Sequence, residues 1–151
     1  MTKNEIETLT FKSRINIQVR MTDIDPLGHV NNGIYFSYYD TGRLNYWKQL
    51  GEDISWEAID KVIVHLKCDF IESILFNDSI RVETKVTEIG NKSFKMMQRI
   101  VDNNTGRLKS TCLSILSGCD RQNNVSIPIP EQFRKRVGDF ENNPDYHHNS
   151  L

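Results

Sequence analysis

The chain has 151 residues, a usual size for one folded domain. Nineteen Lys and Arg residues are balanced by twenty Asp and Glu residues, so the formal net charge is −1. A charge so close to zero gives no reason to expect binding to nucleic acid or to an anionic membrane. No uninterrupted apolar run is long enough to span a bilayer, and the first residues lack the apolar core of a signal peptide. We therefore expect a cytoplasmic protein with a small-molecule or protein partner.

A half-buried strand is the first predicted element. Apolar residues alternate with polar ones from Arg14 to Met21, which is the two-residue period of a strand with one buried face. A turn at Gly28 follows, and Asn31 and Asn32 are then good helix N-cap residues. A helix is expected from about Gly33 to Leu50.

The predicted helix has an unusually broad apolar face, with aromatic residues recurring at helical spacing. A sheet that wraps around the helix would bury such a face. Gly42 lies in the middle of this helix, where glycine costs about 1 kcal/mol relative to alanine. Its presence predicts a close approach between the helix and the sheet.

The second half of the chain predicts an antiparallel sheet. Four further segments have strand-like periodicity: 62–70, 80–86, 94–101 and 108–117. The sequence "DNNTG" between the last two suits a hairpin, and a short helix is expected after Pro130. We therefore predict an α+β domain over residues 1–137, with a sheet of about five strands around one helix. Residues 138–151 are expected to form a polar, mobile tail.

The stretch between the first strand and the helix, "TDIDPLGHVNNGIYF", carries the candidate functional residues. The spacing of Asp23 and Asp25 suggests comparison with an EF-hand calcium loop. Such a loop needs an oxygen ligand at its fifth position and a Glu at its twelfth, whereas this chain has Leu27 and Ile34 there. Calcium is therefore a poor explanation. Turn and N-cap chemistry would account for the same residues without any catalytic role.

The same stretch resembles a known signature. The run "DIDPLGHVNNGIYFSYYDTGR" is similar to that of the acyl-CoA thioesterases of the 4-hydroxybenzoyl-CoA thioesterase family. The resemblance continues through "KVIVHLKCDF", "FNDSIRVETKVTEIGNKSF" and the late "PIP", and covers roughly residues 13 to 135. Members of this family have the hotdog fold, in which an antiparallel sheet wraps around one long helix.

The resemblance also implies roles for individual residues. The family's catalytic carboxylate matches Asp25, and the backbone amide that meets the thioester carbonyl matches Asn32. Asp23 matches a position that supports the loop. Five further residues are candidates for substrate binding: Gly28, His29, Val30, Asn31 and Tyr35. A loop-packing role for His29 and a core role for Tyr35 remain open alternatives.

The implied reaction is hydrolysis of acyl-CoA to a free carboxylic acid and coenzyme A. A carboxylate can attack the thioester carbonyl directly or remove a proton from an attacking water, and the sequence leaves both routes open. Neither a metal nor an organic cofactor is expected, since coenzyme A is part of the substrate. The three cysteines, Cys68, Cys112 and Cys119, lack zinc spacing and are expected to be reduced thiols.

Two other functions remain open at this point: hydrolysis of acyl groups on acyl carrier protein, and binding of acyl thioesters without turnover. Relatives often carry Pro near the start of the stretch after "DF", where this chain has "IESILF", so we expect the local turn to differ.

An open sheet of about five strands leaves edges that a second chain can pair. Together with the resemblance, this predicts a homodimer or homotetramer.

Overall fold

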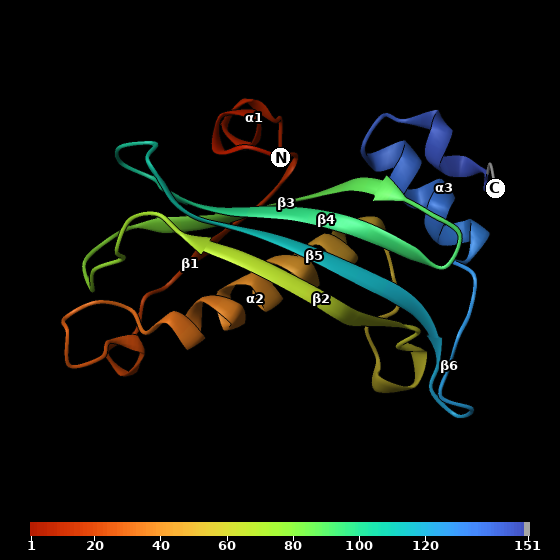
Figure 1. Ribbon diagram of the computed structural model, residues 1–151, viewed down its shortest axis with the longest axis horizontal. Helices are drawn as coiled ribbons and strands as arrows, with labels where there is room; N and C mark the ends of the chain where they lie inside the picture. The colour runs from red at the N-terminus through yellow and green to blue at the C-terminus, as the bar shows by residue number, and fades with distance from the viewer. Residues whose placement is uncertain (150–151) are drawn as a thin grey trace.

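One curled antiparallel sheet packs against one long helix in the computed structural model, which describes residues 1–149 (Figure 1). The sheet consists of β1 (Ser13–Ile17), β2 (Lys61–Phe70), β3 (Ile80–Ile89), β4 (Ser93–Asp102), β5 (Leu108–Asp120) and β6 (Val125–Ser126). The helices are α1 (Lys3–Thr8), α2 (Asn32–Leu50) and α3 (Glu131–Phe140), with short 3-10 turns at Met21–Asp23, Trp56–Ala58 and Pro144–His147. Within residues 1–149, no helix is long and apolar enough to cross a membrane.

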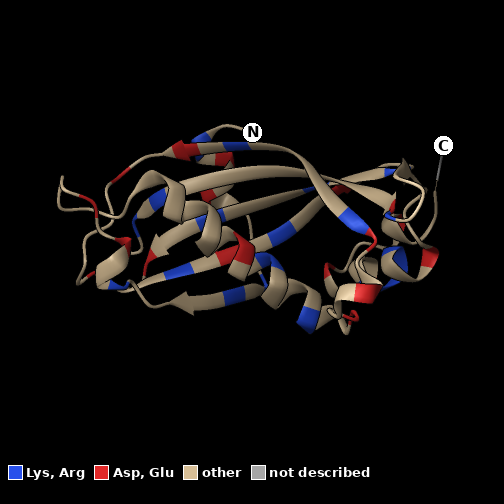
Figure 2. Cartoon of the chain, turned by 90° about the horizontal axis from the view of Figure 1, so that it is seen from below, with Lys and Arg blue, Asp and Glu red and all other residues tan. Residues whose placement is uncertain are grey.

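The strand order is β1-β3-β4-β5-β2, all antiparallel, and β6 pairs with the far end of β5. Strand β2 is therefore at one edge of the main sheet, although it comes second along the chain. Figure 1 shows α2 on one face of the sheet, α1 on the opposite face and α3 at one end. Lys and Arg are interspersed with Asp and Glu over the described part of the chain (Figure 2).

The predicted elements are present in the predicted order, with some differences in extent, and the structure adds α1 and β6. The first strand ends at Ile17 instead of Met21, because Ile17 pairs with Ile80, which is the first residue of β3. The chain then turns through Met21–Asp23. Helix α2 begins at Asn32, and the side chain of Asn31 caps it.

Helix α2 approaches the sheet closely at Gly42, as predicted. A Cβ atom on Gly42 would lie 2.5 Å from Cγ1 of Val82 and 2.8 Å from Nε2 of Gln98. The buried Gln98 side chain donates to the Tyr39 carbonyl at 2.9 Å and accepts from the Arg43 guanidinium at 2.8 Å. Under this part of the helix, small and polar residues form one row across four strands, each residue paired with the next: Thr84, Gln98, Cys112 and Cys68.

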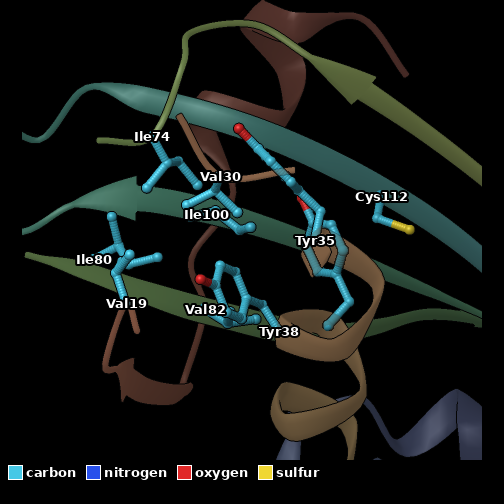
Figure 3. Close-up of a cluster of buried hydrophobic side chains, with 10 residues drawn as sticks. Val19, Val30, Tyr35, Tyr38, Ile74, Ile80, Val82, Ile100 and Cys112 are labelled. Carbon is cyan, nitrogen blue, oxygen red and sulfur yellow. The ribbon is translucent and has the colours of Figure 1, made fainter. Parts of the chain in front are cut away.

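The buried apolar residues form two clusters along α2. The first is at its N-terminal end, where Tyr35, Tyr38 and Val30 pack with Ile74 and residues of the sheet (Figure 3). The second is at its C-terminal end, where α3 packs against Tyr46 and Leu50. The helix is thereby fixed at both ends, and its N-terminus is held next to the loop that precedes it.

The C-terminal segment differs from the expected polar tail. Helix α3 continues to Phe140, and the carboxylate of Glu141 is buried beyond it. This carboxylate accepts from the Tyr46 hydroxyl at 2.7 Å and from the Val86 N–H at 3.1 Å, and pairs with Lys85 at 3.0 Å. The packed structure therefore extends past residue 137, because a polar side chain there satisfies groups of the core. Residues 150–151 of the expected tail lie outside the described residues.

Candidate active site

The loop between β1 and α2 is closed by its own backbone. Ile24 and Val30 form an antiparallel bridge, and the Asp25 N–H donates to the His29 carbonyl at 3.0 Å. The Gly28 N–H donates to the Asp25 carbonyl, also at 3.0 Å, and Gly28 has a φ of +87°. This left-handed conformation favours glycine, so Gly28 serves the turn. The result is a short loop that holds Asp25 at its base.

Asp23 anchors the loop to α2. Its carboxylate is almost completely buried, accepts from the Tyr38 hydroxyl at 2.6 Å and accepts from the Arg20 backbone N–H at 3.0 Å. Its carbonyl oxygen accepts from the Asn31 N–H at 2.9 Å. Burial acts to raise the pKa of Asp23, but the hydrogen bonds from Tyr38 and Arg20, with the charge of Arg20, hold it below its usual value. Asp23 is therefore a fixed anion in a supporting role.

Asp25 is placed differently from Asp23. Its side chain is half-buried, and Oδ1 accepts from the Leu27 N–H at 2.9 Å, which fixes the orientation of the carboxylate. Among residues 1–149, no hydrogen bond or ion pair engages its other oxygen, Oδ2. An oriented carboxylate with one unengaged oxygen can act on a bound molecule as a nucleophile or as a base.

The N-terminus of α2 faces the same space. The Gly33 N–H is bound by the Asn31 side chain at 2.8 Å, and the Ile34 N–H by the Asn31 carbonyl at 2.9 Å. The Asn32 N–H has no partner within the described part of the chain. Because the backbone dipoles of this 19-residue helix add up, its N-terminus carries a partial positive charge. A free N–H in this position can donate to an oxygen that becomes negative during a reaction.

Asp25 and Asn32 line one cavity of about 250 Å³. The other lining residues come from the same loop, from α2 and from the segment after β2: Leu27, His29, Val30, Tyr35, Phe70, Ile71, Glu72 and Ser73. The rings of Tyr35 and Phe70 meet edge to face, with centroids 4.9 Å apart. The cavity thus combines an apolar, aromatic wall with a carboxylate and a helix N-terminus.

Most of the residues singled out in the sequence meet in this cavity. Asp25, His29, Val30, Asn32 and Tyr35 all line it, and Val30 and Tyr35 are also part of the core. The two remaining candidates do not line it. Gly28 forms the turn of the loop, and the side chain of Asn31 caps α2, so both hold the site together from outside the cavity.

The wall formed by residues 70–73 was not among the predicted site residues. The signal available in the sequence was the "IESILF" stretch, which stands out only because it lacks the proline of relatives. Its Glu72 contributes a second carboxylate to the cavity, which pairs with Lys109 at 3.0 Å and with Arg107 at 2.9 Å. The hydrogen bond from Lys109, together with both cationic charges, lowers the pKa of Glu72. Since these cations occupy Glu72, Asp25 is the cavity carboxylate that remains available.

The described residues contain no group of three or more His, Cys, Asp or Glu side chains that could hold a metal ion. A second cavity, of about 210 Å³, lies at the opposite end of α2. Its walls include Leu44 and Trp47 of α2, the segment Glu52–Ile54 and the chain that leads into β2, Ala58–Lys61. One of its residues, Asp53, is a carboxylate held by the Ser55 N–H at 2.9 Å, but the N-terminus of α2 is at the other end of the helix. The cavity at Asp25, which combines a carboxylate with that N-terminus, is therefore the candidate active site.

Comparison with known proteins relates this arrangement to a family. Residues 19–137 match the Thioesterase-like superfamily. Protein YsmA of Bacillus subtilis (strain 168), described as uncharacterized, is 25% identical over 80 residues, which are 53% of this chain and 54% of that protein. The matched part of this chain thus spans about half the length of that relative.

Several solved structures of similar fold are described as thioesterases. A thioesterase from Thermus thermophilus, complexed with coenzyme A and Zn, is 29% identical, with a TM-score of 0.80 over 89% of this chain and 97% of its own. An Asp-to-Asn variant of 4-hydroxybenzoyl-CoA thioesterase, complexed with 4-hydroxybenzoyl-CoA, is 19% identical, with a TM-score of 0.75 over 82% and 96%. These neighbours confirm the predicted hotdog fold, and the family match supports thioester hydrolysis as the activity. The chain belongs to the Thioesterase-like superfamily.

Proposed function

We propose that this protein hydrolyses acyl-CoA thioesters to a free carboxylic acid and coenzyme A. One observation carries the proposal: the unengaged carboxylate oxygen of Asp25 and the unpaired N–H of Asn32 line the same cavity. Attack on a thioester carbonyl requires a nucleophile or base on one side and a hydrogen-bond donor at the carbonyl oxygen. The two groups match these two requirements.

The chemistry at Asp25 follows one of two routes. In the first, Oδ2 attacks the carbonyl carbon, the thiolate of coenzyme A leaves, and water then hydrolyses the resulting mixed anhydride. In the second, the carboxylate takes a proton from a water that attacks the carbonyl carbon. Label found in the Asp25 side chain after a single turnover in water labelled with heavy oxygen would establish the first route, because the second route cannot place label there.

The developing oxyanion is stabilised in both routes by the start of α2. The N–H of Asn32 donates to the carbonyl oxygen, and the partial positive charge of the helix N-terminus adds to the effect. Because this donor belongs to the backbone, substitution of the Asn32 side chain should affect turnover less than substitution of Asp25. The aromatic pair Tyr35 and Phe70 forms an apolar wall for the acyl group.

Coenzyme A is the proposed carrier because the Thermus thermophilus thioesterase, with 29% identity, is complexed with coenzyme A. A panel of acyl-CoA substrates and acylated carrier proteins, followed by release of free thiol, tests this choice. We expect turnover of acyl-CoA. Turnover of acylated carrier protein alone would replace the proposed carrier, and binding without thiol release would replace hydrolysis by a binding function.

We also propose that the protein works as a homodimer joined along β2. This strand is a ten-residue edge of the sheet, and apolar side chains along it are exposed: Val62, Ile63, Val64, Leu66 and Phe70. An unpaired edge leaves backbone donors and acceptors unsatisfied, and long apolar edges are otherwise prone to aggregation. Pairing with β2 of a second copy satisfies both the backbone and the apolar surface.

In this dimer, the cavity at Asp25 of one subunit would lie beside the second cavity, at the other end of α2, of its partner. In a symmetric antiparallel pair, the Phe70 end of β2 lies near the partner's Lys61. The cavity at Asp25 of one subunit therefore opens next to the cavity at the other end of the partner's α2. An acyl-CoA molecule bound at Asp25 would extend across this junction.

The substitution Asp25→Asn tests the catalytic assignment. It nearly preserves the shape of the side chain but removes the charge that both routes require, so we expect kcat/KM to fall by roughly a hundredfold or more. Glu72→Gln is the matched control, since it removes a carboxylate of the same cavity and should leave most of the turnover. Near-normal turnover by a folded Asp25→Asn variant, verified by circular dichroism, would refute the assignment.

A further inference from the structure

A buried lysine lies behind one wall of the candidate active site. Lys109, the second residue of β5, is only 5% exposed, and it is not itself a lining residue of the cavity at Asp25. A lysine ammonium is seldom buried unless acceptors surround it, because transfer of an unpaired charge out of water is unfavourable. The burial of Lys109 must therefore be compensated by its contacts.

The acceptors around the Lys109 side chain lie in the segment that connects β2 to β3. Its Nζ atom donates to the Ser73 carbonyl and to Oε1 of Glu72, both at 3.0 Å, and is 3.4 Å from Oδ2 of Asp78. Residues 71–79 form neither helix nor strand, so the ladder of the sheet does not fix them. Glu72 and Ser73 both line the candidate active site. One ammonium group thus holds two neighbouring residues of the cavity wall.

The backbone of Lys109 contacts the same wall. Its carbonyl oxygen accepts from the Ile71 N–H at 2.9 Å and from the Glu72 N–H at 3.1 Å. These two hydrogen bonds do not involve the side chain, so a substitution of Lys109 leaves them available. Further along, the Ile74 carbonyl accepts from the Val30 N–H at 2.9 Å, which joins the wall to the loop. The lysine side chain therefore supplies the contacts between these two backbone attachments.

Lys109 carries its positive charge throughout the neutral pH range. Burial acts to lower its pKa, but the hydrogen bond with Glu72 and the charges of Asp78 and Glu72 raise the pKa of Lys109 above its usual value. Hydrogen bonds from an ammonium to a carboxylate are shorter and stronger than those between neutral groups. All of these contacts lie within one chain and need no access to solvent, so pairing of β2 with a second copy leaves them in place.

We propose that Lys109 is a positioning residue, which fixes the wall formed by residues 70–73 and thereby sets how tightly the acyl group of the substrate is held. The inference rests on the proposed acyl-CoA site. Phe70 and Ile71 give the cavity apolar surface, and a wall that is fixed before binding loses less conformational entropy when a ligand arrives. Separate hydrogen bonds within the loop hold Asp25, so Lys109 acts on binding of the acyl group and not on the chemical step.

The variant Lys109→Met tests the proposal, because methionine keeps an unbranched side chain but removes the three N–H donors. The probes are S-hexyl-coenzyme A and S-benzyl-coenzyme A, two thioethers that cannot be hydrolysed, and calorimetry compares the tighter of them with coenzyme A itself. We expect the Kd of the thioether to rise roughly tenfold and the Kd of coenzyme A to stay unchanged. Hydrogen exchange should become faster in a peptide that covers residues 70–76. In turnover of acyl-CoA, KM should rise and kcat should stay within about twofold.

Lys85→Met is the matched control. Lys85 also pairs with a buried carboxylate, that of Glu141 at 3.0 Å, but neither of these residues lines the candidate active site. This variant should lose stability without a change in either Kd. If circular dichroism shows that Lys109→Met does not fold, Lys109→Gln takes its place with the same expectations, since its amide keeps N–H donors but carries no charge.

Four results would overturn the proposal: an unchanged Kd for the thioether, an equal rise in the Kd of the thioether and of coenzyme A, unchanged hydrogen exchange in residues 70–76, or the same changes in Lys85→Met. A fall in kcat at constant KM would also overturn it, because Lys109 would then act on the chemical step. Failure of the wild-type protein to release thiol from any acyl-CoA would refute the proposed hydrolysis alone, since the thioethers measure binding without turnover.

Discussion

The hydroxyl of Tyr38 offers a sensitive test of how the candidate active site is held in place. Tyr38→Phe removes one oxygen and leaves the ring, so the packing of the first core cluster is retained. The lost hydrogen bond joins the Tyr38 hydroxyl to the buried Asp23 carboxylate at 2.6 Å. Hydrogen bonds to charged groups contribute roughly 1.5 to 3 kcal/mol, and Arg20 still donates to this carboxylate, so we expect a loss of about 2 kcal/mol of stability.

The pH dependence of this loss is specific. Because the folded-state pKa of Asp23 is held below its usual value, its carboxylate stabilises the fold above the unfolded-state pKa. That stabilisation disappears as the pH falls through the folded-state pKa. Tyr38→Phe removes part of it, so the difference in stability between the wild type and the variant should narrow as the pH is lowered from the unfolded-state pKa, about 4, through the folded-state pKa.

The neighbouring Tyr39→Phe is a matched control. Its hydroxyl is also buried but donates to the neutral Ser110 hydroxyl at 2.7 Å. Urea unfolding should show that the loss in free energy of unfolding changes with pH for Tyr38→Phe and stays constant for Tyr39→Phe. The Tyr38 change should also reduce kcat by roughly tenfold, since Asp23 holds the loop that carries Asp25. Equal pH profiles for the two variants would refute the role assigned to Asp23.

Three other predictions concern packing, metal and assembly. Gly42→Ala should destabilise the protein by up to about 2 kcal/mol, because overpacking costs roughly 1 to 3 kcal/mol and the helix-propensity gain is about 1 kcal/mol. The substitution Thr41→Ala, at an exposed position of the same helix, serves as a control in urea unfolding. Hydrolysis should survive exhaustive treatment with EDTA, and a loss reversed by one divalent ion would contradict this. Val64→Lys on the exposed β2 edge should weaken the dimer at least about tenfold and lower the activity with it, whereas Val125→Lys on β6 should change neither the dimer nor the activity. Sedimentation of the two variants at the assay concentration measures the dimer. A fully active monomer would exclude the dimer and the shared site.

The long elements of the fold could be predicted because their patterns are local. Alternating residues predicted the strands, and Asn31 predicted the start of α2, since an N-cap side chain bonds a backbone group only two residues away. Glycine destabilises the interior of a helix, and this alone was enough to predict the close approach of α2 to the sheet at Gly42. Most of the cavity residues that the loop contributes could be predicted because they lie in one contiguous stretch of sequence.

Features that depend on distant parts of the chain could not be predicted in this way. The six-residue α1 has a capping box of Thr2 and Glu5, but it is too short to be stable alone. It is held by Arg99 of β4, which donates to the Ile6 carbonyl at 2.7 Å. The wall of the cavity at residues 70–73 and the pairing of Cys68 with Cys112 depend likewise on the register between β2 and β5. Single-sequence periodicity predicts strands but not which strands become neighbours.

The carboxylate of Glu141 has a practical consequence for where this chain can be shortened. The match to the superfamily ends at residue 137, four positions before Glu141. A protein cut at that boundary would retain all the matched residues but would leave the Tyr46 hydroxyl and Lys85 without their anion. The end of a domain is better judged from where its buried polar groups find their last partner than from where its similarity to relatives stops.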